Sequence, residues 1–170
     1  QGNYIPALAR RSVLAARERC LPAVPALAPL MDAGDWREST AAIIAVGILG
    51  HAGEVELVAK RRADADWRVR GAVFEALGQL RHMDVVPYLI EGLADRDPIV
   101  KSAALKNLQV LSQSGTGPDI EAWKRWYDEN RGKLDITKRG FREEIPDEYY
   151  GKTKYLIEIL NKAQIVCVLG

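Results

Sequence analysis

The chain has 170 residues, of which 48% are hydrophobic and 28% charged, and this balance supports one packed globular domain, or one domain with an appendage. Its 24 basic and 23 acidic residues leave a formal charge of +1, so nucleic acid and anionic membranes are not the expected partners. The longest apolar runs, residues 41–49 and 165–169, are shorter than the roughly 20 residues of a membrane-spanning helix, and we expect no membrane insertion. Cys20 and Cys167 leave the cellular compartment undecided, because two isolated thiols suit oxidising and reducing surroundings alike.

The first predicted helices lie before residue 35. Residues 5–19 match the pattern of the later helices only if a short gap is allowed, as expected of a terminal unit. Residues 24–27, Val-Pro-Ala-Leu, predict a second helix, because proline is tolerated in a first helical turn. The chain starts on Gln1, which we expect of a processed protein or of a piece of a longer one.

A repeat of 31 residues organises the next part of the chain. Asp35 begins Asp-Trp-Arg, Asp66 begins the same tripeptide 31 positions later, and Asp97 follows after the same interval. Each aspartate precedes an apolar stripe of α-helical period, so we expect it to cap that helix, with a functional row of acids as the alternative. A second helix then starts at Val55, at Val86 and, more weakly, at Pro118. The apolar columns predicted to be buried are Ala41, Ala72 and Ala103; Ile43, Phe74 and Leu105; Val46, Leu77 and Leu108; and Leu49, Leu80 and Leu111.

Residues 66–80, followed by Val-Pro-Tyr-Leu at 86–89, resemble the HEAT-like repeats first noted in phycobilisome lyases. The resemblance covers residues 20–113. It implies an all-α fold, an α-solenoid of about three to four HEAT-like helix pairs over residues 1–117, because each pair is too small to bury its own apolar stripe. It also implies a non-catalytic module that binds a protein partner on its surface, as an interaction or scaffold protein.

We expect the partner to contact the second helices on the concave face of the solenoid. The side chains expected there are Glu56, Lys60, Tyr88 and Glu91.

Arg70 and Lys101 occupy another column of the repeat. We expect them to form a solvated ion-pair ladder with Asp64 and Asp95, rather than a track for phosphates. Such a ladder would be structural.

Enzymatic relatives give the sequence no catalytic residue. Deoxyhypusine hydroxylase, which is built from HEAT-like repeats, holds iron with His-Glu pairs, and no His-Glu pair occurs here. His51 and His82 lie one period apart, but two histidines without further convergent ligands do not predict a metal site. We therefore expect no enzyme, no metal and no cofactor.

The alternative function is nucleic-acid binding in the manner of the HEAT-like alkylpurine DNA glycosylases. These enzymes place aromatic and basic side chains on a concave face, and the residue types are supplied by Trp36, Trp67, Arg37, Arg61, Arg62 and Arg68. The two tryptophans share a repeat column, which favours a packing role at the helix start instead.

A different part of the chain, residues 118–170, follows the turn at Ser-Gly-Thr-Gly. Asp119 can cap a helix that carries Ile120, Trp123 and Trp126 on one side. This helix either closes the open end of the solenoid or presents Trp123 and Trp126 to a partner.

The last residues predict an extended linker and the start of a second domain. Residues 165–169 are β-branched and apolar on both faces, which suits a strand in a covered sheet, so we expect assembly with further sequence or with another chain. The series at 123–126, 149–151 and 164–169 resembles the lead-in to a von Willebrand A-type domain in bacterial HEAT-repeat proteins. The metal motif of that family follows its first strand, so no metal residue is carried over.

Overall fold

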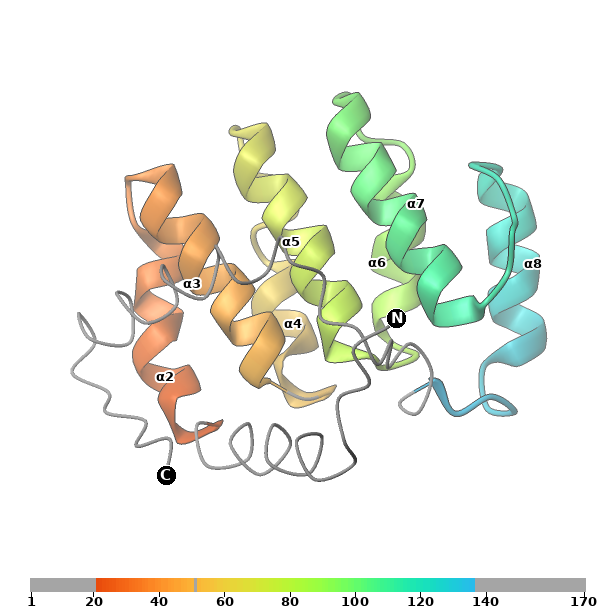
Figure 1. Cartoon of the computed structure of the whole chain (residues 1–170), viewed down its shortest axis with the longest axis horizontal. Coiled ribbons are helices and arrows are strands. Elements are labelled where there is room, and N and C mark those ends of the chain that lie inside the picture. Colours follow the sequence, from red (N-terminus) through yellow and green to blue (C-terminus); the bar gives the residue numbers. More distant parts are fainter. Residues whose placement is uncertain (1–20, 51, 137–170) are drawn as a thin grey trace, which may run out of the picture.

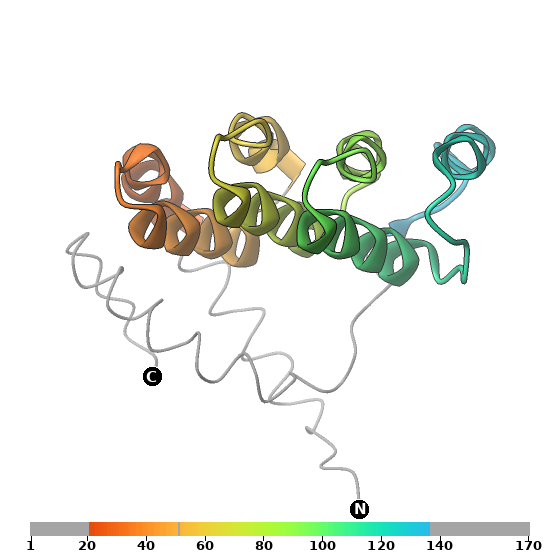
Figure 2. The ribbon, with the colours of Figure 1, turned by 90° about the horizontal axis from the view of Figure 1, so that it is seen from above.

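The computed structural model describes residues 21–50 and 52–136. Over these residues the chain is all-α, as predicted, and its helices lie in two rows (Figures 1 and 2). The first row holds α3 (Trp36–Leu49), α5 (Trp67–Leu80) and α7 (Pro98–Ser112). The second row holds α2 (Val24–Leu27), α4 (Val55–Ala59), α6 (Val85–Gly92) and α8 (Ile120–Asn130), with the 3-10 turns η1 (Leu21–Ala23), η2 (Ala28–Asp32) and η3 (Ala52–Glu54) beside α2 and α4.

Some of the predicted features lie outside the described residues. They are the helix at 5–19, His51, most of the linker, the strand at 165–169 and the lead-in to a second domain after residue 136. None of the described helices is long and apolar enough to cross a membrane.

The first-row helices begin 31 residues apart because the same cap recurs. The carboxylates of Asp35, Asp66 and Asp97 accept hydrogen bonds from the backbone N–H two residues further on, at 2.8, 2.9 and 2.8 Å. Each bond satisfies a donor that the first helical turn leaves without a partner. The capping prediction is confirmed.

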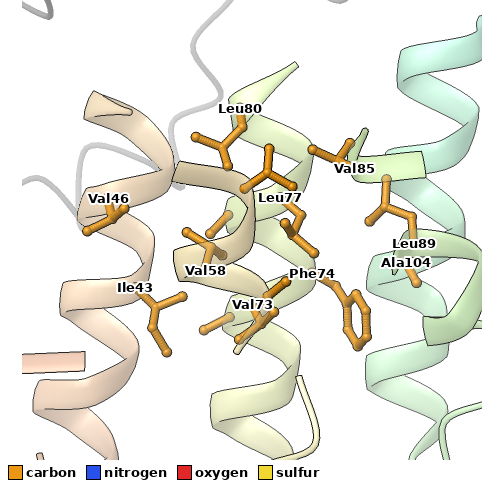
Figure 3. Packing of buried hydrophobic residues seen from close by; sticks show 14 of the residues in the cluster. Ile43, Val46, Val58, Val73, Phe74, Leu77, Leu80, Val85, Leu89 and Ala104 are labelled. Carbon is orange, nitrogen blue, oxygen red and sulfur yellow. The ribbon is translucent and has the colours of Figure 1, made fainter. Parts of the chain in front are cut away.

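The predicted columns form the core between the two rows (Figure 3). The columns at Val46 and at Leu49 are buried in all three copies, and each such side chain contributes about 1.5–3 kcal/mol through burial. In the other two columns, Ala41, Ala103 and Leu105 are only partly buried.

Glycine lets the first-row helices approach each other closely. A Cβ on Gly47 would lie 2.6 Å from the Cα of Ala76, and a Cβ on Gly78 would lie 2.0 Å from the Oδ1 of Asn107. The contacts of α3 with α5 and of α5 with α7 are the most extensive in the described residues, whereas the second-row helices stand apart (Figure 2).

The predicted contact residues lie on one row of helices. Glu56, Lys60, Tyr88 and Glu91 belong to the second row, at α4 and α6 or directly after α4. Their place on second helices is as predicted, and contact of this row with a partner on a concave face stays a prediction.

Helix α8 continues the second row beside α6 (Figure 1). The Asp119 carboxylate accepts hydrogen bonds from the backbone N–H groups of Glu121 and Ala122, at 2.9 and 3.2 Å, so the predicted cap is confirmed. Trp123 is fully buried in the same core as the first-row helices. Residues on both sides of the expected boundary at 117/118 thus pack together.

Candidate functional site

The units of the array meet at two joints, which carry the candidate sites. The upstream joint brings α2 and α3 against α4 and α5, and the downstream joint brings α4 and α5 against α6 and α7. Each joint has one side between second-row helices, which we call its outer side. Its edge lies at the N-terminal ends of first-row helices (Figures 1 and 2).

A polar cluster closes the outer side of the downstream joint. The Tyr88 hydroxyl donates a hydrogen bond to Oε1 of Glu56 at 2.5 Å, and this bond is the main reason that the pKa of Tyr88 is raised. The Arg62 guanidinium lies 5.3 Å from the centre of the Tyr88 ring, and its Nε lies 3.1 Å from Oε2 of Glu91. The structure thus brings three of the four predicted contact residues together, joined by Arg62.

The same columns leave an open groove on the outer side of the upstream joint. One period before Glu56, Arg62, Tyr88 and Glu91 stand Pro25, Met31, Leu57 and Lys60. With neighbouring residues of α2, η2 and α4 they line a groove of about 280 Å³. The polar cluster of one joint is therefore an apolar hollow in the other.

Lys60 is an exposed cation of this groove, and the exposed carboxylate of Asp32, which pairs with Arg61, also lines it. The Lys60 ammonium has no carboxylate partner among the described residues. Arg61, by contrast, is fully engaged: its Nη1 donates to the Met31 carbonyl at 2.6 Å and to Oδ1 of Asp32 at 2.8 Å, and its other nitrogens donate to Asp64. These bonds raise the pKa of Arg61, that to Asp64 most, and they hold the end of η2 against α4 as a groove wall.

An aromatic stack closes the edge of the upstream joint. The guanidinium carbons of Arg37 and Arg68 lie 4.6 and 3.9 Å from the centre of the Trp36 ring. Asp66 holds Arg68 there by accepting from its Nε at 2.9 Å and from its Nη2 at 2.6 Å, and the hydrogen bonds from Arg68 lower the pKa of Asp66. The packing role predicted for Trp36 is confirmed.

The edge of the downstream joint stays open. Trp67 is 40% exposed. Ile99, which stands in the repeat column where the earlier units have arginine, is 57% exposed. No cation lies over the Trp67 ring among the described residues. The packing role predicted for Trp67 is wrong, because Arg68 reaches back to Trp36 and the next unit offers isoleucine instead of arginine.

Arg70 forms a buried ion pair instead of a solvated ladder. Its Nε and Nη2 donate to the two carboxylate oxygens of Asp95 at 2.7 and 2.9 Å, and its Nη1 donates to the Asp64 carbonyl at 2.8 Å. The side chains of Arg70 and Asp95 are only 5% and 9% exposed. Arg70 holds the pKa of Asp95 below its usual value, so the pair is a structural tie between units.

The arginines of the nucleic-acid alternative are each paired with an acid. Arg61 is paired with Asp32 and Asp64, Arg62 with Glu91, and Arg68 with Asp66. Phosphate binding would have to displace these carboxylates, so the three arginines do not form a basic track.

The histidine pair of the sequence yields no metal cluster in the part of the chain that the structure describes. His82 Nδ1 lies 3.1 Å from Oδ2 of Asp84, and His51 is outside the described residues. No group of three or more ligating side chains gathers within residues 21–50 and 52–136.

The two tryptophans of α8 differ in accessibility. Trp123 has no exposed surface, and its Nε1 donates to the Gly117 carbonyl at 2.7 Å. Trp126 packs edge-on against it, with 5.9 Å between ring centres, and is only partly buried. A partner cannot contact Trp123 in this arrangement, so that predicted role is corrected, while contact by Trp126 stays a prediction.

Comparison with known families now gives the array its class. Residues 54–123, from the end of η3 to the first turn of α8, match the family of HEAT repeats. This part of the chain is similar to HEAT repeats. Repeats of this kind commonly mediate protein–protein interaction. The comparison with curated proteins found no match.

Sequence reasoning missed the open positions of both joints. Leu57 and Pro25 escaped notice because they are ordinary apolar residues, and so did Ile99. Reading each column for residues that change character between repeats would have found all three, since the 31-residue interval aligns them with Tyr88, Glu56 and Arg68.

Proposed function

We propose that this protein is a non-catalytic interaction module that binds an extended segment of a partner protein in the upstream groove. The observation that carries the proposal is the exchange of the polar cluster for an open, apolar hollow at equivalent columns. A hollow of about 280 Å³ can seat one apolar side chain of a partner.

The charge of the groove favours a partner segment with a carboxylate beside that apolar side chain. Lys60 is exposed at the rim, and Arg61 is committed to its own acids, so Lys60 is the cation offered to a partner. An ion pair at a rim adds more to association rate and specificity than to affinity.

The polar cluster would serve as a second, weaker contact. Glu56, Tyr88 and Glu91 lie on the same row of helices as the groove, so a segment that runs along the second row would reach them (Figure 2). Because these side chains already satisfy one another, we expect their truncation to weaken binding less than closure of the groove.

The test is quantitative affinity capture from the native source with the 170-residue chain and three variants. Pro25→Glu with Leu57→Tyr copies the closed joint into the groove, Lys60→Glu reverses the rim charge, and Lys106→Glu on the exposed face of α7 is the control. We expect a partner that binds the wild type and the control with equal affinity. Its affinity for the double variant should be at least about tenfold lower, which is about 1.4 kcal/mol of binding free energy. A partner held equally by all four, each folded by circular dichroism, would reject the groove as its site.

Nucleic-acid binding remains the alternative. Supporting it would require retardation of duplex DNA at low salt that weakens when Arg61, Arg62 and Arg68 are neutralised, because phosphate contacts are salt-dependent. The phycobilisome-lyase subclass, the adhesion-type second domain and assembly through residues 165–169 are likewise proposals, supported by the sequence alone.

A further inference from the structure

The downstream edge repeats the upstream stack with one member missing. At the upstream edge, Arg68 lies on Trp36 from 32 positions further along the chain and is held by Asp66. At the downstream edge, the residue 32 positions after Trp67 is Ile99, and Asp97 stands where Asp66 stands. The ring and the carboxylate are kept, and the guanidinium is absent.

The two remaining members are accessible. Trp67 is 40% exposed, and Ile99, in the first turn of α7, is 57% exposed. Asp97 uses Oδ1 to cap α7, accepting from the Ile99 N–H at 2.8 Å, and its Oδ2 has no hydrogen-bond partner among the described residues. In the upstream stack the corresponding oxygen, Oδ2 of Asp66, accepts from Arg68 Nη2 at 2.6 Å.

We propose that the edge formed by Trp67, Asp97 and Ile99 binds an arginine side chain of a partner protein. The guanidinium would stack on the Trp67 ring and donate to Asp97, as Arg68 does on Trp36 and Asp66, while its aliphatic stem lies on Ile99. Aromatic rings attract cations, and the adjacent carboxylate repels phosphate, so a cationic protein segment fits this edge better than a nucleic acid.

Arg96 is the nearby cation to consider. Its Nη2 donates to the Ala65 carbonyl at 3.0 Å, which ties it to the loop before α5. Its charge weakens the attraction for an incoming guanidinium, so Arg96→Gln should tighten binding.

This proposal deepens the proposed function by naming the chemistry of a second partner contact, and the probe separates the two. N-acetyl-arginine amide is titrated into the 170-residue chain at millimolar concentrations, because one stacked side chain gives only a weak complex. The observable is the indole N–H resonance of Trp67, assigned by its loss in Trp67→Phe. The neutral isostere N-acetyl-citrulline amide is the matched ligand.

We expect a saturable shift of the Trp67 resonance with the arginine probe, little shift with the citrulline probe, and loss of the response in Asp97→Asn. In Ile99→Arg the protein supplies its own guanidinium, so the response to the probe should disappear while the fold is kept. The groove variant Pro25→Glu with Leu57→Tyr should respond like the wild type, so failure of the groove leaves this test intact.

Three results would overturn the inference. They are an equal response to citrulline, an unchanged response in Asp97→Asn, and a Trp67 shift caused by a short single-stranded oligonucleotide but not by arginine. The last would instead assign the exposed ring to base stacking.

Discussion

The two joints of the array use the same columns and leave opposite sides open. The upstream joint is open on its outer side, at Leu57, and closed at its edge, where Arg68 covers Trp36. The downstream joint is closed on its outer side, where Tyr88 bonds Glu56, and open at its edge, where Trp67 is exposed. A repeat can therefore keep its packing columns and change its surface chemistry, because the buried columns and the surface positions are different residues of the repeat.

The joints also differ at one column of the first-row helices. At the upstream joint the Ser39 hydroxyl donates to the Met31 carbonyl at 2.6 Å and so ties α3 to the segment before it. At the downstream joint Arg70, in the same column, donates to the Asp64 carbonyl in the segment before α5 and also pairs with Asp95 in the loop before α7. The upstream tie is thus one neutral hydrogen bond, and the downstream tie includes a buried ion pair.

The largest expected effect comes from breaking the buried tie. Arg70→Met should lower the free energy of unfolding by about 3–5 kcal/mol, because it leaves the Asp95 carboxylate buried without its cation. Urea denaturation of the wild type and the variant measures this loss of unfolding free energy. Adding Asp95→Leu should restore much of the loss, and a double variant as unstable as the single one would contradict the ion-pair explanation.

Acid should reduce the difference in stability between the wild type and Arg70→Met. Since Arg70 lowers the pKa of Asp95, the pair contributes its full stability above the usual carboxyl pKa of about 3.9 and loses it as the pH falls through the lowered value. The gap between wild type and Arg70→Met in urea unfolding should therefore be largest at neutral pH and shrink in acid. A gap that does not change with pH would assign the effect to packing alone.

Small residues of the first row give the next effect. Gly47→Ala should destabilise by about 1–3 kcal/mol, because the added methyl meets the backbone of Ala76. Gly78→Ala meets the Asn107 side chain, which also donates to the Phe74 and Ala103 carbonyls. Asn107→Ala should rescue Gly78→Ala and leave Gly47→Ala unchanged in thermal unfolding; rescue of both would mean that the helices shift freely.

The upstream tie should be weaker than the downstream one. Ser39→Ala removes one buried hydroxyl and should cost about 1 kcal/mol, including the carbonyl left without this donor. Arg61 still donates to the same Met31 carbonyl, which limits the loss. If chemical denaturation showed that Ser39→Ala loses as much unfolding free energy as Arg70→Met, the two ties would not differ in strength.

Closing the open edge should have the smallest effect. Ile99→Arg should stabilise by about 0.5–1 kcal/mol, as an exposed cation–π contact does, and Ile99→Gln is the control without charge. The gain should vanish in Trp67→Ala. A gain that persists without the ring would show that the arginine acts elsewhere, for example on Asp97 alone.

Much of the array was predictable because each repeat carries local sequence signals for its helices. The three aspartate caps, the starts of α3, α5 and α7 and the buried columns at Val46 and Leu49 all follow from the 31-residue interval. The candidate surface was predictable in part: Glu56, Tyr88 and Glu91 do come together on the second row, but through Arg62, which the sequence did not single out for this surface. Of the two alternatives for α8, the one that presents Trp123 to a partner is wrong, since the spacing of the aromatic residues does not say which side of the helix meets the core.

The sequence by itself determined the helices, their caps and the apolar stripe, because these depend on contacts within a few residues or on a short period. Only the tertiary structure decided that Arg70 is buried and that Arg68 covers Trp36 while Trp67 stays exposed. These outcomes depend on how closely Gly47 and Gly78 let neighbouring helices approach, and on which side chain of the next unit then reaches the joint.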